Sequence, residues 1–178
     1  VFSGETGIGF LNHMVSQLAR HGLFDINLEV KGDTDVDSHH SVEDAAITLG
    51  WAFLEAFGDR SGIRRMGHAI VPLDEALAMV ALDCSDRGYP KIQTTLDDSV
   101  IGALSGDMIK HFLETFAIEA RINLHVKVLD GTSPHHKAEV IFKALARALR
   151  DAVELDPRAS GQIPSTKGAL ETQTSARP

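Results

Sequence analysis

Two hydrophobic periodicities alternate along the chain. Apolar residues spaced three and four positions apart predict amphipathic helices over residues 10–20, 42–57, 107–120 and 137–153. Strict apolar–polar alternation predicts strands over 24–30 and 122–128, and apolar stretches on both sides of Pro72–Glu75 and at 89–95 predict three more. Because helices and strands are interleaved without a long linker, the pattern indicates a single α+β domain over residues 1–170. The polar residues 171–178 are expected to form a disordered tail.

The second half of the chain resembles the first. The sequence around His13 matches that around His111, which lies 98 residues later. The stretches 26–30 and 39–43 match 122–126 and 135–139, in both cases 96 residues later. Self-similarity at a nearly fixed offset is typical of duplicated units. We therefore expect two similar helix-strand-loop-helix halves, about 7–95 and 105–170, related by pseudo-twofold symmetry.

Composition excludes several classes of protein. The chain has 178 residues and a formal net charge of −8, which argues against a nucleic-acid partner because such partners are bound by basic patches. Cys84 is the only cysteine, so no intramolecular disulfide can form, and a reducing cytoplasmic location is expected. No apolar run approaches the roughly 20 residues of a membrane span. The start of the chain lacks the pattern of a signal peptide.

Nine histidines are the unusual feature of the composition, and six of them occupy positions that match between the two halves. These six are His13, His39, His40, His111, His135 and His136, and each His-His pair is followed by a carboxylate, Glu43 or Glu139. In a helix that begins near His39, positions i and i+4 share a face, so His39 and Glu43 can bind one ion. His40 points about a quarter turn away and is expected to bind a second ion.

Neutral imidazole with a few carboxylates suits Mn, Fe, Zn, Co or Ni, and the lack of cysteine ligands argues against structural zinc. A single His-His pair is most often an exposed pair without a functional role, but its duplication in the two halves favours a metal site. Asp35 and Asp37 precede the first pair and can orient the imidazoles or simply cap the helix. His21, His68 and His125 have no counterpart in the other half.

Five sequence blocks together resemble one enzyme family, the imidazoleglycerol-phosphate dehydratases. The blocks are Gly7-Ile8-Gly9-Phe10-Leu11-Asn12-His13-Met14, Asp37-Ser38-His39-His40-Ser41-Val42-Glu43-Asp44, Pro72-Leu73-Asp74-Glu75-Ala76, Pro134-His135-His136-Lys137-Ala138-Glu139 and Ile163-Pro164-Ser165-Thr166-Lys167-Gly168. The resemblance implies dehydration of imidazole glycerol phosphate to imidazole acetol phosphate in L-histidine biosynthesis. It also implies two Mn²⁺ per active site, helices packed between sheets, and a shell of twenty-four subunits with sites at subunit contacts.

The same resemblance implies a strand and a substrate-contacting Glu upstream of the first block. The chain begins at Val1, so we expect that strand to be missing, and we expect residues 4–9 to form a loop.

An anionic substrate in an acidic protein requires local cations. The resemblance makes Arg65, Arg87, Ser165 and Lys167 the strongest candidates for binding phosphate, with Lys143 and Thr166 as further candidates. The general base is not assigned by the sequence. Glu43 and His21 are candidates, as is the upstream Glu.

Two other functions use the same residues. A dinuclear phosphohydrolase would activate water with the same ions, and a non-enzymatic storage shell would bind metal on histidine-rich helices. Neither His-His-x-x-Glu unit supplies a full ligand set for two ions unless the halves meet, either within one chain or between chains. The resemblance favours contacts between chains.

Overall fold

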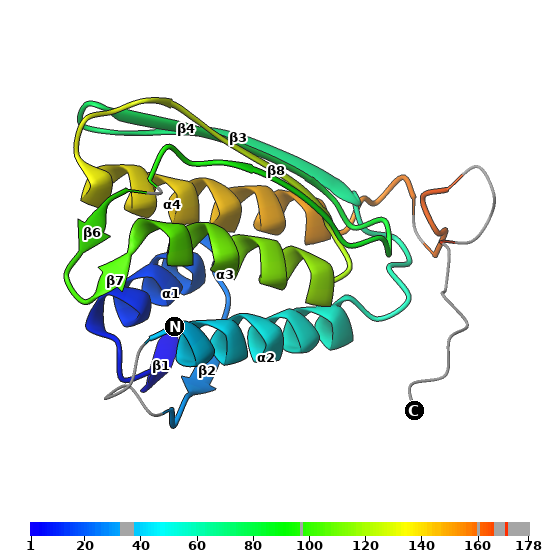
Figure 1. Cartoon of the computed structure of the whole chain (residues 1–178). Helices are drawn as coiled ribbons and strands as arrows, with labels where there is room; N and C mark the ends of the chain where they lie inside the picture. The colour runs from blue at the N-terminus through cyan, green and yellow to red at the C-terminus, as the bar shows by residue number, and fades with distance from the viewer. Residues whose placement is uncertain (33–37, 97, 160, 166–169, 171–178) are drawn as a thin grey trace.

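The computed structural model describes residues 1–32, 38–96, 98–159, 161–165 and 170 (Figure 1). Its elements are, in chain order, β1 (Phe2–Glu5), α1 (Gly9–Gly22), β2 (Ile26–Glu29), α2 (His39–Phe57), β3 (Met66–Leu73), β4 (Ala76–Asp83), β5 (Tyr89–Gln93), β6 (Val100–Ile101), β7 (Leu104–Ser105), α3 (Gly106–Glu119), β8 (Asn123–Asp130) and α4 (Pro134–Val153). The predicted tail at 171–178 lies outside the described residues.

The helices form the middle of an α+β arrangement. The strand order β3-β4-β8-β5 makes a four-stranded sheet, and α4 packs on β3 and β4 while α3 packs beside β5. On the far side of these helices lie α1, which packs on α4, and α2, which packs on α3. The short β1-β2 sheet lies beyond α1 and α2, so the helices are held between two sheets (Figure 1). This arrangement agrees with the predicted fold class.

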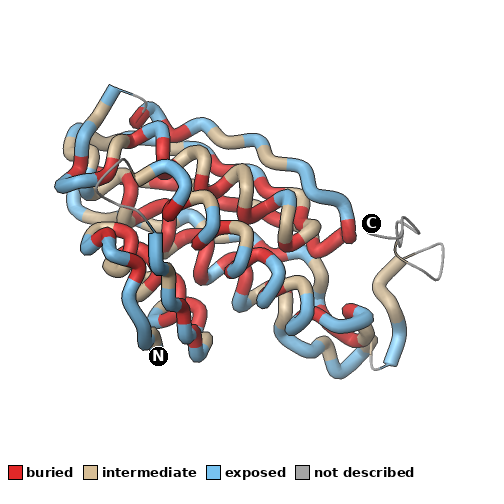
Figure 2. The backbone as a smooth tube through the Cα atoms, turned by 60° about the horizontal axis from the view of Figure 1, so that its bottom comes forward, coloured by how far each residue is buried: buried red, intermediate tan, exposed pale blue. Residues whose placement is uncertain are grey.

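The helix α4 packs closely on the large sheet. Many of its buried positions are alanines, which let a strand approach the helix backbone. Gly67 on β3 lies so near that an added Cβ would stand 2.0 Å from the carbonyl oxygen of Ala148. Phe112, Phe116 and Phe142 are fully buried, and the ring centroid of Phe112 on α3 lies 5.5 Å from that of Phe142 on α4. Figure 2 shows these buried stretches of the helices in red.

Each half contains a helix, a strand and a second helix in the same order. In the first half these are α1, β2 and α2, and in the second half α3, β8 and α4. The strand that precedes the first helix also corresponds, because β1 pairs in parallel with β2 as β5 pairs in parallel with β8.

The prediction of no strand before the first helix was wrong. Phe2–Glu5 forms β1 and pairs with Ile26–Glu29, so part of the 4–9 stretch expected to be a loop is strand. A four-residue segment that contains a serine and a glycine carries little periodicity, and its conformation is decided by pairing with β2 about 24 residues away. The helices α2 and α4 also begin earlier than their apolar stripes, so that His39 and His135 fall in first turns.

Among the described residues, none of the helices combines the length and the hydropathy needed to cross a bilayer.

Candidate metal centres and phosphate-binding residues

Two helix pairs bring the predicted ligands together. Because α1 packs on α4, His13 meets His135 and Glu139; because α2 packs on α3, His111 meets His39 and Glu43. In each set, one ligand atom per residue lies within 4.8 Å of the others. We call these sets the Glu139 cluster and the Glu43 cluster. Each combines the first-helix histidine of one half with the His-His-x-x-Glu helix of the other half, so the halves meet within one chain.

In the Glu139 cluster, the carboxylate already touches every partner. Its Oε2 lies 3.1 Å from His13 Nε2 and 3.3 Å from His135 Nε2, while Oε1 accepts a 2.7 Å hydrogen bond from Lys143 Nζ. Burial raises the pKa of Glu139, but the bonds from Lys143 and His13 outweigh burial and lower the pKa to about 2. The carboxylate is therefore ionised and suited to binding a cation.

In the Glu43 cluster, the two imidazoles stack and the carboxylate stays further away. The rings of His39 and His111 have centroids 4.8 Å apart at an interplanar angle of 28°. Glu43 Oε1 lies 3.4 Å from His111 Nε2, and that nitrogen is buried with no hydrogen-bond partner in the described part of the chain. A buried nitrogen without a partner is costly unless something binds it, and a metal ion would satisfy it.

The second histidine of each pair lies outside these clusters. Neither His40 nor His136 belongs to a three-ligand set of the described residues. His136 Nδ1 lies 2.7 Å from Glu75 Oε2, and the hydrogen bond raises the pKa of His136 and lowers the pKa of Glu75 to about 2. A carboxylate on one ring nitrogen fixes the tautomer and leaves the other nitrogen for a ligand.

The sequence predicted no role for Glu75, although this residue lies in one of the five blocks. It sits in the β3–β4 turn, where its Oε1 also accepts a 2.7 Å bond from the backbone N–H of Ser133, the N-cap of α4. No spacing rule connects this turn with a helix that starts about 60 residues later. Only the pairing of β4 with β8 brings them together.

One predicted phosphate residue, Arg65, lies at the opposite end of α4, where its backbone N–H donates to the carbonyl of Ala152. Arg65 donates through Nε and Nη2 to both oxygens of Asp83, at 2.7 and 2.9 Å, and through Nη1 to the carbonyl of Pro164 at 2.6 Å. Ser165 is therefore close to Arg65 in the chain's fold. Thr166 and Lys167 lie outside the described residues. Arg87 is exposed and makes no ion pair with any described residue.

The other candidates lie between these regions. Lys143 bonds Glu139, so in this structure it stabilises a predicted ligand. His21 lies two turns along α1 from His13, with Nε2 3.1 Å from Gln17 Oε1. Burial lowers the pKa of His21, and the nearby charges of Lys143 and Arg147 lower it further. The neutral ring is therefore favoured.

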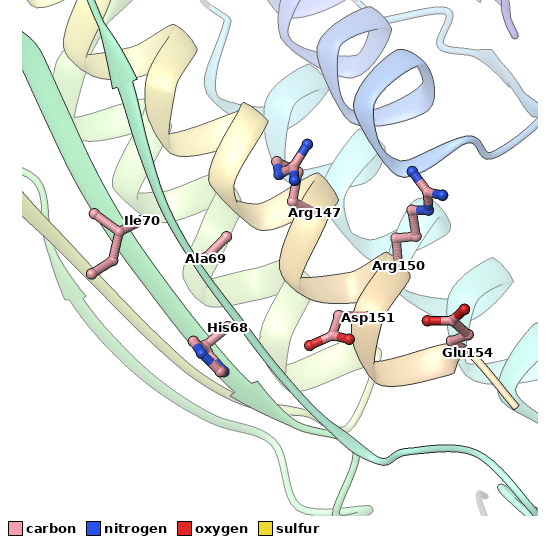
Figure 3. Close-up of a pocket in the computed structure, with 7 residues that line it drawn as sticks. All are labelled: His68, Ala69, Ile70, Arg147, Arg150, Asp151 and Glu154. Atoms are coloured by element: carbon pink, nitrogen blue, oxygen red, sulfur yellow. The ribbon is translucent and has the colours of Figure 1, made fainter. Parts of the chain in front are cut away.

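A cavity of about 440 Å³ between β3 and α4 contains none of the predicted ligands (Figure 3). It is lined by His68, Ala69, Ile70, Arg147, Arg150, Asp151 and Glu154. Its two carboxylates are both held by Arg64, at 2.6 and 3.1 Å. The cavity is thus separate from the clusters.

Fold and site together define a class of protein: an α+β chain in which paired helices gather two histidine–carboxylate clusters from duplicated halves. The family profile described as imidazoleglycerol-phosphate dehydratase matches residues 6–149. The chain belongs to this family.

Individual relatives agree with the assignment. The imidazoleglycerol-phosphate dehydratase of Methanothermobacter thermautotrophicus is 55% identical over 168 residues, which cover 94% of this chain and 84% of the relative. That of Dehalococcoides mccartyi is 56% identical over 166 residues, covering 93% and 83%. The solved structure of the Staphylococcus aureus enzyme has a TM-score of 0.80 at 35% identity, covering 85% of this chain and 86% of that one. The Pyrococcus furiosus structure has a TM-score of 0.81 at 34% identity, covering 94% and 91%.

Proposed function

We propose that this chain is a metal-dependent dehydratase that converts imidazole glycerol phosphate to imidazole acetol phosphate and water, a step of L-histidine biosynthesis. Family membership supports the reaction. The observation that carries the metal dependence is the pair of clusters, each with two imidazole nitrogens and one carboxylate oxygen within 4.8 Å. Manganese or a similar divalent ion suits these donors. A single free, buried thiol, Cys84, is compatible with a cytoplasmic enzyme.

The residues present fit one ion in each cluster. His13, His135 and Glu139 would hold one ion, and His39, Glu43 and His111 the other. Bound divalent ions would act as Lewis acids that polarise the imidazole ring and a hydroxyl of the substrate. Glu139 enters this role already ionised, and Glu75 holds His136 in one tautomer. Glu43 and His21 are the candidates for moving the proton that the reaction removes from carbon.

We further infer that the active site is shared between copies of the chain. The backbone N–H of Arg65 donates to the carbonyl of Ala152, and Ala152 lies 17 residues beyond His135 on the same helix. At 1.5 Å per residue this is about 25 Å, too far for one small phosphorylated imidazole to span from the metal ligands to Arg65. The phosphate-binding residues of one copy would therefore serve the clusters of another.

Two histidines support the same conclusion. His40 and His136 lie beside the clusters without joining them, and three protein ligands leave a position open on each ion. We infer that His40 and His136 bind the ions of neighbouring copies, so that metal holds a large homo-oligomer together. The twenty-four-subunit shell expected from the family resemblance fits this arrangement.

One experiment tests the metal, the reaction and the assembly on the same sample. Metal analysis of the Mn-loaded protein should give two ions per chain, with His39→Ala losing one and the control His125→Gln losing none, because His125 lies on β8 away from both clusters. Incubation with imidazole glycerol phosphate should yield a phosphorylated ketone. Chelation should reduce the particle size.

Each contrary result has a distinct meaning. Release of inorganic phosphate would indicate the phosphohydrolase, and metal far above two ions per chain would indicate storage. A large particle that is unchanged after complete metal removal would exclude metal-bridged subunits.

A further inference from the structure

Two carboxylates, Asp83 at the end of β4 and Asp86 in the link to β5, bind three arginines, while Arg87 in the same link pairs with none of the described residues. Asp83 holds Arg65 in a bidentate pair. Asp86 Oδ1 lies 3.0 Å from Arg60 Nη1 and 3.6 Å from Arg121 Nη1. Arg87 follows directly, is exposed, and pairs with no described residue. Asp86 is thus bound on the protein side, while its neighbour presents a guanidinium to solvent.

The Arg60–Asp86 pair is deeply buried. The side chains of Arg60 and Asp86 are only 6% and 4% exposed, and the Arg60 guanidinium lies 5.8 Å from the Phe57 ring centroid. Nε and Nη2 of Arg60 are buried without a hydrogen-bond partner in the described part of the chain. Asp86 therefore supplies the only described countercharge to this cation, and neutralising Asp86 would leave a buried charge unpaired.

The pair ties the segment to two helix ends. Arg60 follows the end of α2 and Arg121 follows the end of α3, so one carboxylate joins both helices to the link between two strands. Asp86 has a φ of +67°, in the left-handed region that non-glycine residues rarely adopt. The ion pairs hold this turned backbone, and the turn sets the direction in which the chain presents Arg87.

We propose that Asp86 is a positioning residue that fixes Arg87 for binding the phosphate of the substrate. This inference rests on the proposed function, because it takes Arg87 as a phosphate ligand. Asp86 itself touches no substrate. It affects binding only through the conformation of its own backbone, which precedes Arg87. The ion pairs with Arg60 and Arg121 keep that backbone in place before the substrate arrives. Substrate binding therefore does not carry the entropic cost of ordering the segment.

The test is a double-mutant cycle of Asp86→Asn and Arg87→Ala in the Mn-loaded assembly, measuring KM, kcat, the Kd of imidazole glycerol phosphate by calorimetry, and the melting temperature. Arg87→Ala should raise Kd and KM by about 10 to 100-fold, the size expected for one charge-assisted contact. Asp86→Asn should raise both about 10-fold and change kcat less than about 3-fold. In the Arg87→Ala background, Asp86→Asn should leave Kd and KM unchanged while still lowering the melting temperature.

Two further variants keep the test decisive if Asp86→Asn does not fold. Arg121→Gln removes the more exposed of the two arginines that pair with Asp86, and it should raise the Kd of imidazole glycerol phosphate about 3-fold. Arg64→Gln removes a neighbouring arginine whose ion pairs among the described residues are with Asp151 and Glu154, and it should leave Kd unchanged.

The outcomes separate the two levels of inference. If Arg87→Ala binds substrate normally, Arg87 is not a phosphate ligand and that part of the proposed function fails. If Arg87→Ala weakens binding but Asp86→Asn weakens it equally with and without Arg87, or not at all, the positioning role is overturned and the phosphate role of Arg87 stands.

Discussion

The Glu139 and Glu43 clusters each combine two histidines and one glutamate, but their surroundings differ. Glu139 is 14% exposed and bound by Lys143 one helical turn later, whereas Glu43 is 38% exposed and has Ile47 at the equivalent position. One carboxylate is ionised and held before any ion arrives, and the other lies against its histidine at 3.4 Å. The comparison shows that duplication preserved the ligands while the residues that support them diverged.

The largest expected effect comes from removing each carboxylate ligand in turn. Glu139→Gln and Glu43→Gln should each reduce bound manganese from two ions to one per chain and lower kcat at least about 100-fold, because an amide is a weaker donor than a carboxylate. Only Glu139→Gln should also lower the melting temperature of the metal-free protein, since it leaves Lys143 without its partner. Equal melting temperatures for the two variants would contradict the comparison.

A smaller effect should follow from exchanging the supporting residues. Lys143→Ile makes the Glu139 cluster resemble the other, and we expect manganese affinity there to fall about 10-fold, as for other residues that orient a ligand. Manganese titration followed by electron paramagnetic resonance measures this directly, with Arg147→Gln, one turn further along α4, as the matched control. Unchanged manganese affinity combined with a raised KM would assign Lys143 to the substrate instead.

The smallest effect concerns His21, beside the Glu139 cluster. Its lowered pKa means that below its ordinary pKa, 6.5, the unfolded chain binds a proton more readily than the folded chain does. The free energy of unfolding should therefore fall as pH decreases from about 6.5 through the folded-state pKa. His21→Gln should flatten this part of the curve in urea titrations of the metal-free protein. A curve that is unchanged in His21→Gln would show that His21 titrates normally.

Much of the fold could be predicted from local pattern. The helices and most strands carry clear periodicity, so α1, α3 and β8 lie within a few residues of their predicted ranges. The strand β1 could not be predicted, because a short segment with a serine and a glycine becomes a strand only through its pairing with β2. For the site, the repeat placed six histidines and two carboxylates in equivalent positions without showing which of them meet.

The sequence by itself determined the element order, the duplication and the ligand types, because periodicity and residue identity are local properties that survive without a fold. Tertiary structure decided which candidate ligands lie together. Helix pairing of α1 with α4 and of α2 with α3 joins His13 to Glu139 and His111 to Glu43 across the halves. It also placed Glu75 on His136, and placed Arg65 beside Ala152, about 25 Å along α4 from His135. These are long-range relations, and they arise only when the buried faces of helices and sheets pack against one another.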